Sequence, residues 1–314
     1  MAKITFRLYR LGGLTIASQL ELPGLPRART ESVDVTLRIG TPPILKDAFE
    51  VEPRCMANGC EYLHTFPGVA NFYIRGGEEI VVEPFDLNRL DELRSILHAE
   101  IFAVLFSRRG LLPLHGSAVC ATGSDGRVFG FLGRSGAGKS SLVAFLSRRG
   151  YKVIADDLTL LNRTCEGVTK VTPCAPWLKL WGDTLDGLAE PVQGLEAIAG
   201  KDSKYRFPLT RGAGEAEELL PLAGLFVLDF TTREEVLISP LEPAAAVAKL
   251  MLYSYPILMI HKLGGSAQLF QQCGEILATV PMWTFSRPWN LAKIEKSLDI
   301  LQLHMSRILL ESSS

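Results

Sequence analysis

The stretch Gly133-Arg134-Ser135-Gly136-Ala137-Gly138-Lys139-Ser140 decides the fold class of this 314-residue chain. Its two spaced glycines, followed by a lysine and a hydroxyl residue, match the eight-residue pattern of a phosphate-binding loop. We call this stretch the glycine loop. An apolar run at 127–132 precedes it, and Leu142, Phe145 and Leu146 follow at helical spacing. The pattern therefore predicts an α/β fold in which a strand leads through the glycine loop into a helix.

Each part of the glycine loop has a chemical reason. Glycines allow successive main-chain N–H groups to turn toward phosphate oxygens, and the start of the following helix attracts the same anion. Lys139 supplies a positive charge for the terminal phosphates, and the Ser140 hydroxyl is a ligand for Mg²⁺. We therefore expect ATP and Mg²⁺ as ligands. The predicted nucleotide contacts are Gly133, Arg134, Ser135, Gly136, Ala137, Gly138, Lys139, Ser140 and Ser141.

Two adjacent acids, Asp156 and Asp157, follow the apolar run Val153-Ile154-Ala155. If this run and the strand before the glycine loop are neighbours in a parallel sheet, the acids lie beside the loop. One carboxylate there can bind Mg²⁺, and the other can accept a proton from an attacking hydroxyl. The alternative is that the pair only caps and turns the chain. The spacing does not decide which acid has which role.

Three further residues are weaker candidates. His115 stands before Gly116, just ahead of the hairpin that leads into the glycine loop, where a histidine is either an active-site group or a structural residue. Lys204 and Arg206 could contact a transferring phosphoryl group, because ammonium and guanidinium groups both bind phosphate. A solvated loop is the equal alternative for these two cations.

Composition excludes several classes of protein. The 33 basic and 34 acidic residues give a net charge of −1, so no broad field attracts nucleic acid. No apolar stretch approaches the roughly 20 residues of a membrane-spanning helix. The amino terminus lacks the apolar segment of a secretory signal, and the six cysteines form no Cys-x-x-Cys pair. We expect a cytoplasmic protein with no nucleic-acid or membrane partner.

The order of patterns along the chain predicts three parts. Residues 1–85 alternate polar and apolar side chains in short runs, with hairpins expected around Gly12-Gly13 and Gly76-Gly77, which predicts a smaller β-rich unit. Apolar residues at helical spacing from Asp86 to Gly110 predict one long linking helix over 86–110. Residues 111–314 then form the domain that contains the glycine loop, with further helices starting near Pro243, Ala267 and Asn290.

Residues 114–161 resemble the HPr serine kinase/phosphorylase family. Its histidine-glycine pair, phosphate loop and strand ending in Asp-Asp occur here in the same order, as His115-Gly116, the glycine loop and Asp156-Asp157. The resemblance implies a compact core like that of phosphoenolpyruvate carboxykinase, with antiparallel strands beside the loop. It also implies that His115 is oriented against Asp156, that Asp156 accepts the proton, and that Asp157 lies nearer the metal with Ser140.

The chain departs from the bifunctional enzymes of that family at three places. It has Arg134 and Ser141 where they have an aspartate and a glutamate, and their downstream Leu-Glu-x-Arg-Gly signature has no match at 173–188. The fuller layout, including Leu178-Lys179-Leu180-Trp181, resembles the HPr-kinase-related proteins found with lasso peptide biosynthetic genes. Some members of that group phosphorylate serine on a precursor peptide.

These observations predict an ATP-dependent and Mg²⁺-dependent serine kinase with Lys139, Asp156 and His115 as catalytic residues. The acceptor is a serine of a peptide or small protein, or in the alternative a small metabolite such as free serine. A nucleotide-binding regulator without transfer activity is the third hypothesis. The sequence leaves open the acceptor, the role of residues 1–85 and the oligomeric state, a homo-oligomer included.

Overall fold

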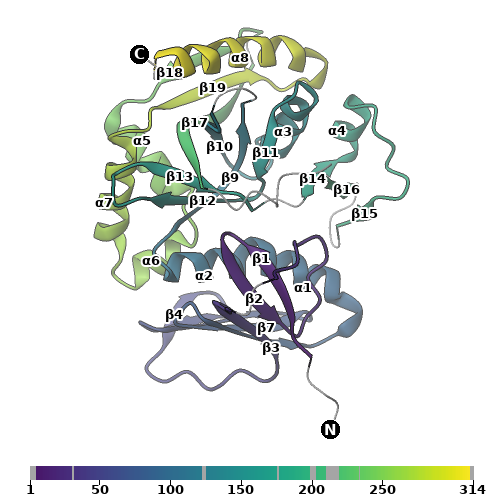
Figure 1. The fold of residues 1–314 in the computed structure, drawn as a ribbon, viewed down its shortest axis with the longest axis vertical. Coiled ribbons are helices and arrows are strands. Elements are labelled where there is room, and N and C mark those ends of the chain that lie inside the picture. Colours follow the sequence, from purple (N-terminus) through teal and green to yellow (C-terminus); the bar gives the residue numbers. More distant parts are fainter. Residues whose placement is uncertain are drawn as a thin grey trace.

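The computed structural model describes residues 5–29, 32–121, 125–174, 177–198, 203–209, 219–232 and 234–311. The fold is mixed α/β. One sheet, near the N-terminus, lies below a second sheet that is flanked by helices, and the helical segment α1–α2 lies between the two (Figure 1). Among the described residues, no helix is both long and apolar enough to cross a membrane.

The front sheet contains eight strands in the order β1-β2-β3-β8-β7-β6-β5-β4. The sequence predicted the hairpin around Gly12-Gly13 and the hairpin of β7 and β8, and both are present, whereas β4, β5 and β6 were not predicted. The strand bounds are β1 Arg7–Leu11, β2 Leu14–Ser18, β3 Val35–Ile39, β4 Phe49–Glu52, β5 Cys55–Ala57, β6 Glu61–Phe66, β7 Ala70–Arg75 and β8 Glu79–Pro84.

The linking helix begins as expected but is not uniform. The Asp86 side chain accepts a hydrogen bond from the main-chain N–H of Asn88 at the start of a short 3₁₀ turn. The helix continues as α1 (Leu90–Ile96), widens into a π turn at Leu97–Ile101, and ends as α2 (Phe102–Arg108). Its apolar side packs on the front sheet, and Leu158 and Leu160 from the second sheet join the same core. The front sheet and the second sheet are therefore joined by shared apolar packing.

The second sheet holds the glycine loop. Its strand order is β10-β9-β12-β13-β17-β19-β18, with β11 paired to β9. Because β10 also pairs with β17, the strands β10, β9, β12, β13 and β17 close into a ring. The bounds are β9 Leu112–Cys120, β10 Val128–Leu132, β11 Lys152–Ala155, β12 Leu158–Arg163, β13 Thr169–Thr172, β17 Leu220–Thr231, β18 Leu237–Pro240 and β19 Met282–Pro288.

Helices cover two sides of this sheet. On one side, α3 (Lys139–Arg148) and α8 (Ile294–Glu311) pack on Phe131, Phe226 and Phe285. On the other, α5 (Pro243–Leu252) and α7 (Ser266–Leu277) pack on Leu112, Leu132 and Leu225. The predicted helix starts near Pro243, Ala267 and Asn290 are confirmed, and α6 (Ile257–Lys262) was not predicted.

A small third sheet lies beside α3. It has the order β14-β16-β15 and consists of β14 (Trp177–Trp181), β16 (Lys204–Pro208) and β15 (Glu196–Ala197), with α4 (Gly182–Gly187) following β14. Antiparallel pairing places Lys179 opposite Arg206 and Trp181 opposite Lys204. One face of this sheet therefore carries alternating aromatic and cationic side chains.

The arrangement considered for the acids, in which their strand neighbours the strand before the glycine loop in a parallel sheet, is not the one observed. The strand before the acids, β11, pairs antiparallel with β9, and β9 lies between β11 and β10. The acids still reach the loop, because β9 lies between β10 and β11 and the chain turns back after Ala155 into β12, which pairs with the other half of β9.

Candidate functional site

The glycine loop connects β10 to α3, as the sequence predicted. The main chain of Gly138 has φ +73°, a conformation that favours glycine, and α3 begins at the next residue. The Lys139 side chain is buried and folds back over the loop. Its ammonium donates hydrogen bonds to the carbonyl oxygens of Gly133, at 2.8 Å, and Arg134, at 3.2 Å. Burial lowers the pKa of Lys139 to about 8, against the opposing charges of Asp157 and Asp156.

Asp156 lies behind the glycine loop and accepts three hydrogen bonds. Its Oδ1 accepts from the Ser117 hydroxyl at 2.6 Å and from the Ser140 hydroxyl at 2.8 Å. Its Oδ2 accepts from the main-chain N–H of Lys179 at 3.1 Å. Burial raises the pKa of Asp156, and the neighbouring charge of Asp157 raises it further. A carboxylate of the acid pair thus directly contacts the loop serine.

Asp157 faces a different set of groups. Its main chain has φ +63°, which aspartate tolerates better than most residues. Asp157 forms an ion pair of 2.7 Å with the Lys179 ammonium. Burial alone would raise the pKa of Asp157, but Lys179 outweighs burial and holds that pKa well below its usual range.

His115 lies on β9 opposite Leu158, which follows the two acids. Its Nδ1 is 3.0 Å from the Tyr255 hydroxyl, and the two rings meet edge to face. Burial, followed by the charge of Lys139, lowers the pKa of His115 to about 4 even though Asp157 acts in the opposite direction. The imidazole is therefore neutral near pH 7. The next position, 116, favours glycine, because a Cβ there would lie 2.8 Å from Leu132 and 3.0 Å from the Phe131 carbonyl oxygen.

Most of the predicted site residues line one cavity of about 570 Å³. It brings together Lys139 and Ser140 of the loop, His115, and Asp157, whereas Asp156 lies behind its wall. Among the other predicted contacts, Ser135, Gly136, Gly138, Ser141 and Lys204 line the cavity, and Gly133, Arg134 and Ala137 do not. The expected pairing of His115 with Asp156 is not seen: the hydrogen-bonding partners of Asp156 are Ser117, Ser140 and Lys179, and His115 lies nearer Asp157.

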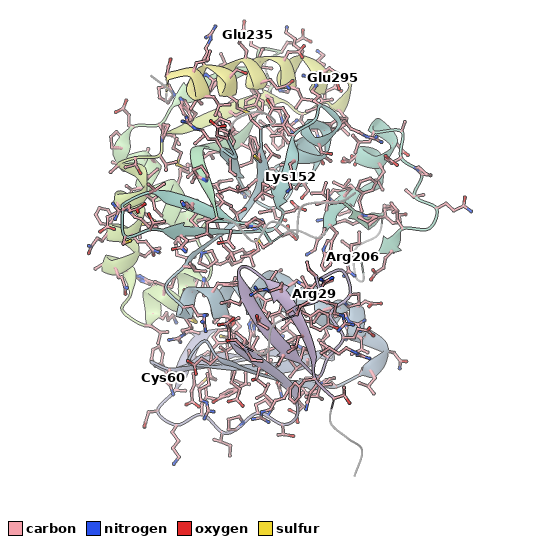
Figure 2. The ribbon with its side chains drawn as sticks, viewed as in Figure 1. Arg29, Cys60, Lys152, Arg206, Glu235 and Glu295 are labelled. Atoms are coloured by element: carbon pink, nitrogen blue, oxygen red, sulfur yellow. The ribbon has the colours of Figure 1, made fainter. Side chains whose placement is uncertain are left out.

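Arg206 does not line the cavity. Its guanidinium donates two hydrogen bonds of 2.8 Å to Glu196, stacks on Trp177, and reaches Ser95 of α1. In Figure 2 it lies between the third sheet and the helical layer below. Because its charge is already paired, Arg206 joins these two elements and is not available to a phosphate at the loop. Lys204, the other predicted cation, lies over the Trp181 ring at the edge of the cavity.

The sequence analysis did not identify three residues of the site. Lys179 and Tyr255 lie far along the chain from Asp157 and His115, and only the fold brings them together. Arg287, at the end of β19, is 4% exposed and lines the cavity, and its guanidinium has no ion pair or hydrogen bond with the described residues. A Cβ on Gly138 would lie 2.6 Å from its Nη2. The sequence Ser286-Arg287-Pro288 carries no signal that would have identified it.

The oxygen donors present at the loop fit Mg²⁺. Ser140 and Asp156 provide a hydroxyl and a carboxylate 2.8 Å apart, and Mg²⁺ at nucleotide sites takes only one or two protein ligands besides phosphate and water. The described residues contain no group of three or more histidine, cysteine, aspartate or glutamate side chains arranged to hold a metal by themselves. Any Mg²⁺ here would therefore bind together with phosphate oxygens.

Comparison with known proteins leaves the site to be interpreted from its geometry. Neither a scan against protein-family models nor a search of curated proteins found a match to this chain.

Proposed function

We propose that the chain is an ATP-dependent, Mg²⁺-dependent kinase that transfers the γ-phosphate to a serine hydroxyl of a peptide or small protein. One observation carries the proposal: the loop serine, Ser140, contacts a buried carboxylate of the acid pair, in a site where Lys139, His115 and Asp157 share one cavity. Nucleotide binding by itself needs only the loop. The acid pair and the neutral histidine supply what a transfer reaction needs in addition.

The contacts favour a division of roles opposite to the one that the resemblance implied. Asp156 and Ser140 would hold Mg²⁺, since their oxygens are already adjacent. Asp157 would accept the hydrogen bond of the acceptor hydroxyl, since Asp157 and His115 line the cavity and Asp156 does not. Because Lys179 keeps Asp157 a weak base, the proton would pass to it only as the bond to phosphorus forms. Mg²⁺ would supply charge neutralisation for the phosphates.

The remaining chemistry is positioning. Lys139 and the main-chain N–H groups of the loop would bind the β- and γ-phosphates, and Lys139 would exchange its carbonyl partners for phosphate oxygens. The serine oxygen would attack the γ-phosphorus, the bond from that phosphorus to the bridging oxygen of ADP would break, and the serine proton would pass to Asp157. Neutral His115, held by Tyr255, would form one hydrogen bond with the serine substrate, as donor or as acceptor.

The test compares Asp156→Asn with Asp157→Asn. Asp157→Asn should lose at least about a hundredfold in transfer, the usual scale for general-base catalysis, and Asp156→Asn should lose transfer through weaker Mg²⁺ binding. Asp156→Asn should also raise the Mg²⁺ concentration needed for half-maximal rate, whereas Asp157→Asn should leave that concentration unchanged. Equal turnover of both variants and the wild type would refute the proposal, and the reverse Mg²⁺ dependence would exchange the two roles.

Acceptor panels distinguish the alternatives. Phosphate incorporation, measured by mass spectrometry, should appear with serine-containing peptides and not with free serine. Incorporation into free serine would favour the metabolite kinase, and ATP binding without transfer to any acceptor would favour the regulator.

We also expect little phosphorylase activity. In the family that the chain resembles, this reverse reaction is associated with the Leu-Glu-x-Arg-Gly signature, which has no match at 173–188. Rapid phosphate-dependent release of pyrophosphate from the phosphorylated product would contradict this expectation.

A further inference from the structure

A second group of cavity residues lies on the side of the glycine loop away from the acids. The strand order places β10 between β9, which carries His115, and β17, and places β19 beyond β17. The turn after β19 carries Trp289 and Asn290, which line the same cavity as the loop. The cavity therefore extends from Asp157, across the loop, to the turn after β19.

Arg287 is the first feature of this side that requires a ligand. Its guanidinium is buried against Gly138 and lies over the Phe230 ring at 5.2 Å, with no carboxylate or carbonyl partner among the described residues. Leaving a buried charge without a counter-charge is costly, so such a group in a cavity wall indicates an anionic ligand. The position beside Gly138 places that anion next to the start of α3.

Trp289 is the second feature. Its side chain is 66% exposed although it lines the cavity, and its ring contacts Phe230 with a centroid separation of 3.9 Å and an interplanar angle of 77°. The Phe230 ring thus contacts both Arg287 and Trp289. An exposed indole ring in a cavity wall suits stacking on a planar ligand. Beside it, the Asn290 Oδ1 caps the next turn, which leaves its amide N–H groups as donors.

The direction of a bound nucleotide connects the two features. In the proposed reaction the γ-phosphate must face Asp157 and His115, so the nucleoside must extend to the opposite side of the loop. That side is the one with Arg287 and Trp289. We propose that Arg287 contacts the phosphates beside the loop and that Trp289 stacks on the base. This inference rests on the proposed function for the presence of a nucleotide.

Stacking also predicts the specificity. Every base has an aromatic face, so a site that depends on stacking discriminates weakly between purines. We therefore expect ATP and GTP to bind with affinities within about tenfold of each other.

The experiment measures, by calorimetry, the binding of ATP, GTP and inorganic tripolyphosphate, which has no base. Trp289→Ala should weaken ATP and GTP binding by roughly 5- to 160-fold, the range for loss of one base–aromatic stack, and leave tripolyphosphate binding unchanged. Trp289→Phe should keep most of the affinity for ATP. Arg287→Gln should weaken all three ligands. Trp181→Ala, which removes the exposed tryptophan on the acid side of the same cavity, is the matched control and should change none of them.

The outcomes separate this inference from the proposed function. Unchanged ATP affinity in Trp289→Ala, or an equal loss for tripolyphosphate, would overturn the base site while leaving the kinase intact. Loss of ATP affinity in Trp181→Ala alone would place the base on the acid side. A raised KM for a peptide acceptor with unchanged ATP affinity in Trp289→Ala would assign the tryptophan to the acceptor. If the wild type bound neither ATP nor tripolyphosphate, both proposals would fail.

Discussion

The ion pair between Lys179 and Asp157 should stabilise the fold as well as the site, and Lys179→Met tests this. Its oxygen and nitrogen atoms are 2.7 Å apart, and the side chains are 13% and 24% exposed. With an effective dielectric constant of about 20, the attraction at this distance is ~6 kcal/mol before the cost of desolvation. Removing one partner of a buried pair costs about 3–5 kcal/mol, and partial exposure places this pair near 3 kcal/mol.

The variant should therefore lower the free energy of unfolding by about 3 kcal/mol at pH 7, and the thermal midpoint by roughly 6 °C. The main-chain N–H of Lys179 still reaches Asp156, so the substitution removes only the ammonium. Lys293→Met is the matched control, because Lys293 and Glu234 form a pair whose side chains are 43% and 84% exposed. The control should change stability by less than about 0.5 kcal/mol.

The pH dependence follows from the depressed pKa of Asp157. A carboxyl group whose pKa is lower in the folded protein contributes stability above its unfolded pKa, about 3.9, and loses that contribution as the pH falls. The difference between wild type and Lys179→Met, measured by urea denaturation, should therefore hold from pH 7 to about pH 5 and shrink as the pH falls further. Adding Asp157→Asn to Lys179→Met should restore most of the stability. Additive losses in the double variant, or a difference that does not depend on pH, would refute the reasoning.

Two further predictions concern the glycine loop. Lys139→Ala should fold and lose most of its affinity for triphosphate. The affinity of the wild type should weaken up to tenfold per pH unit above about pH 8, because Lys139 in the free protein must then take up a proton to bind phosphate. Calorimetry that showed unchanged affinity in the variant, or a flat wild-type profile to pH 9.5, would contradict the loop assignment. Gly138→Ala should lower the thermal midpoint more than Gly136→Ala. Both glycines have positive φ, with a strain of about 1–2 kcal/mol for alanine, but only the alanine at 138 meets Arg287. Equal midpoints would show that the Arg287 contact has no cost.

Local pattern was sufficient for much of the fold. The hairpin glycines, the Asp86 cap, the strand before the loop and the periodic Leu142, Phe145 and Leu146 identified elements that the structure contains. The strands β4 to β6 were missed. β4 and β5 contain only four and three residues, and pairing with neighbouring strands decides the conformation of all three. The π turn at Leu97–Ile101 was missed because a helical spacing pattern does not register one extra residue in a turn.

The sequence by itself determined the glycine loop, because the two glycines, Lys139 and Ser140 act within one local turn whose backbone depends on those residues. It also identified Asp156, Asp157 and His115 as candidates. Only the tertiary structure decided their partners: Ser140 for Asp156, Lys179 for Asp157 and Tyr255 for His115. The same holds for Arg287, whose burial depends on β19 lying next to β17. Contacts between residues distant along the chain depend on strand order, which no local pattern specifies.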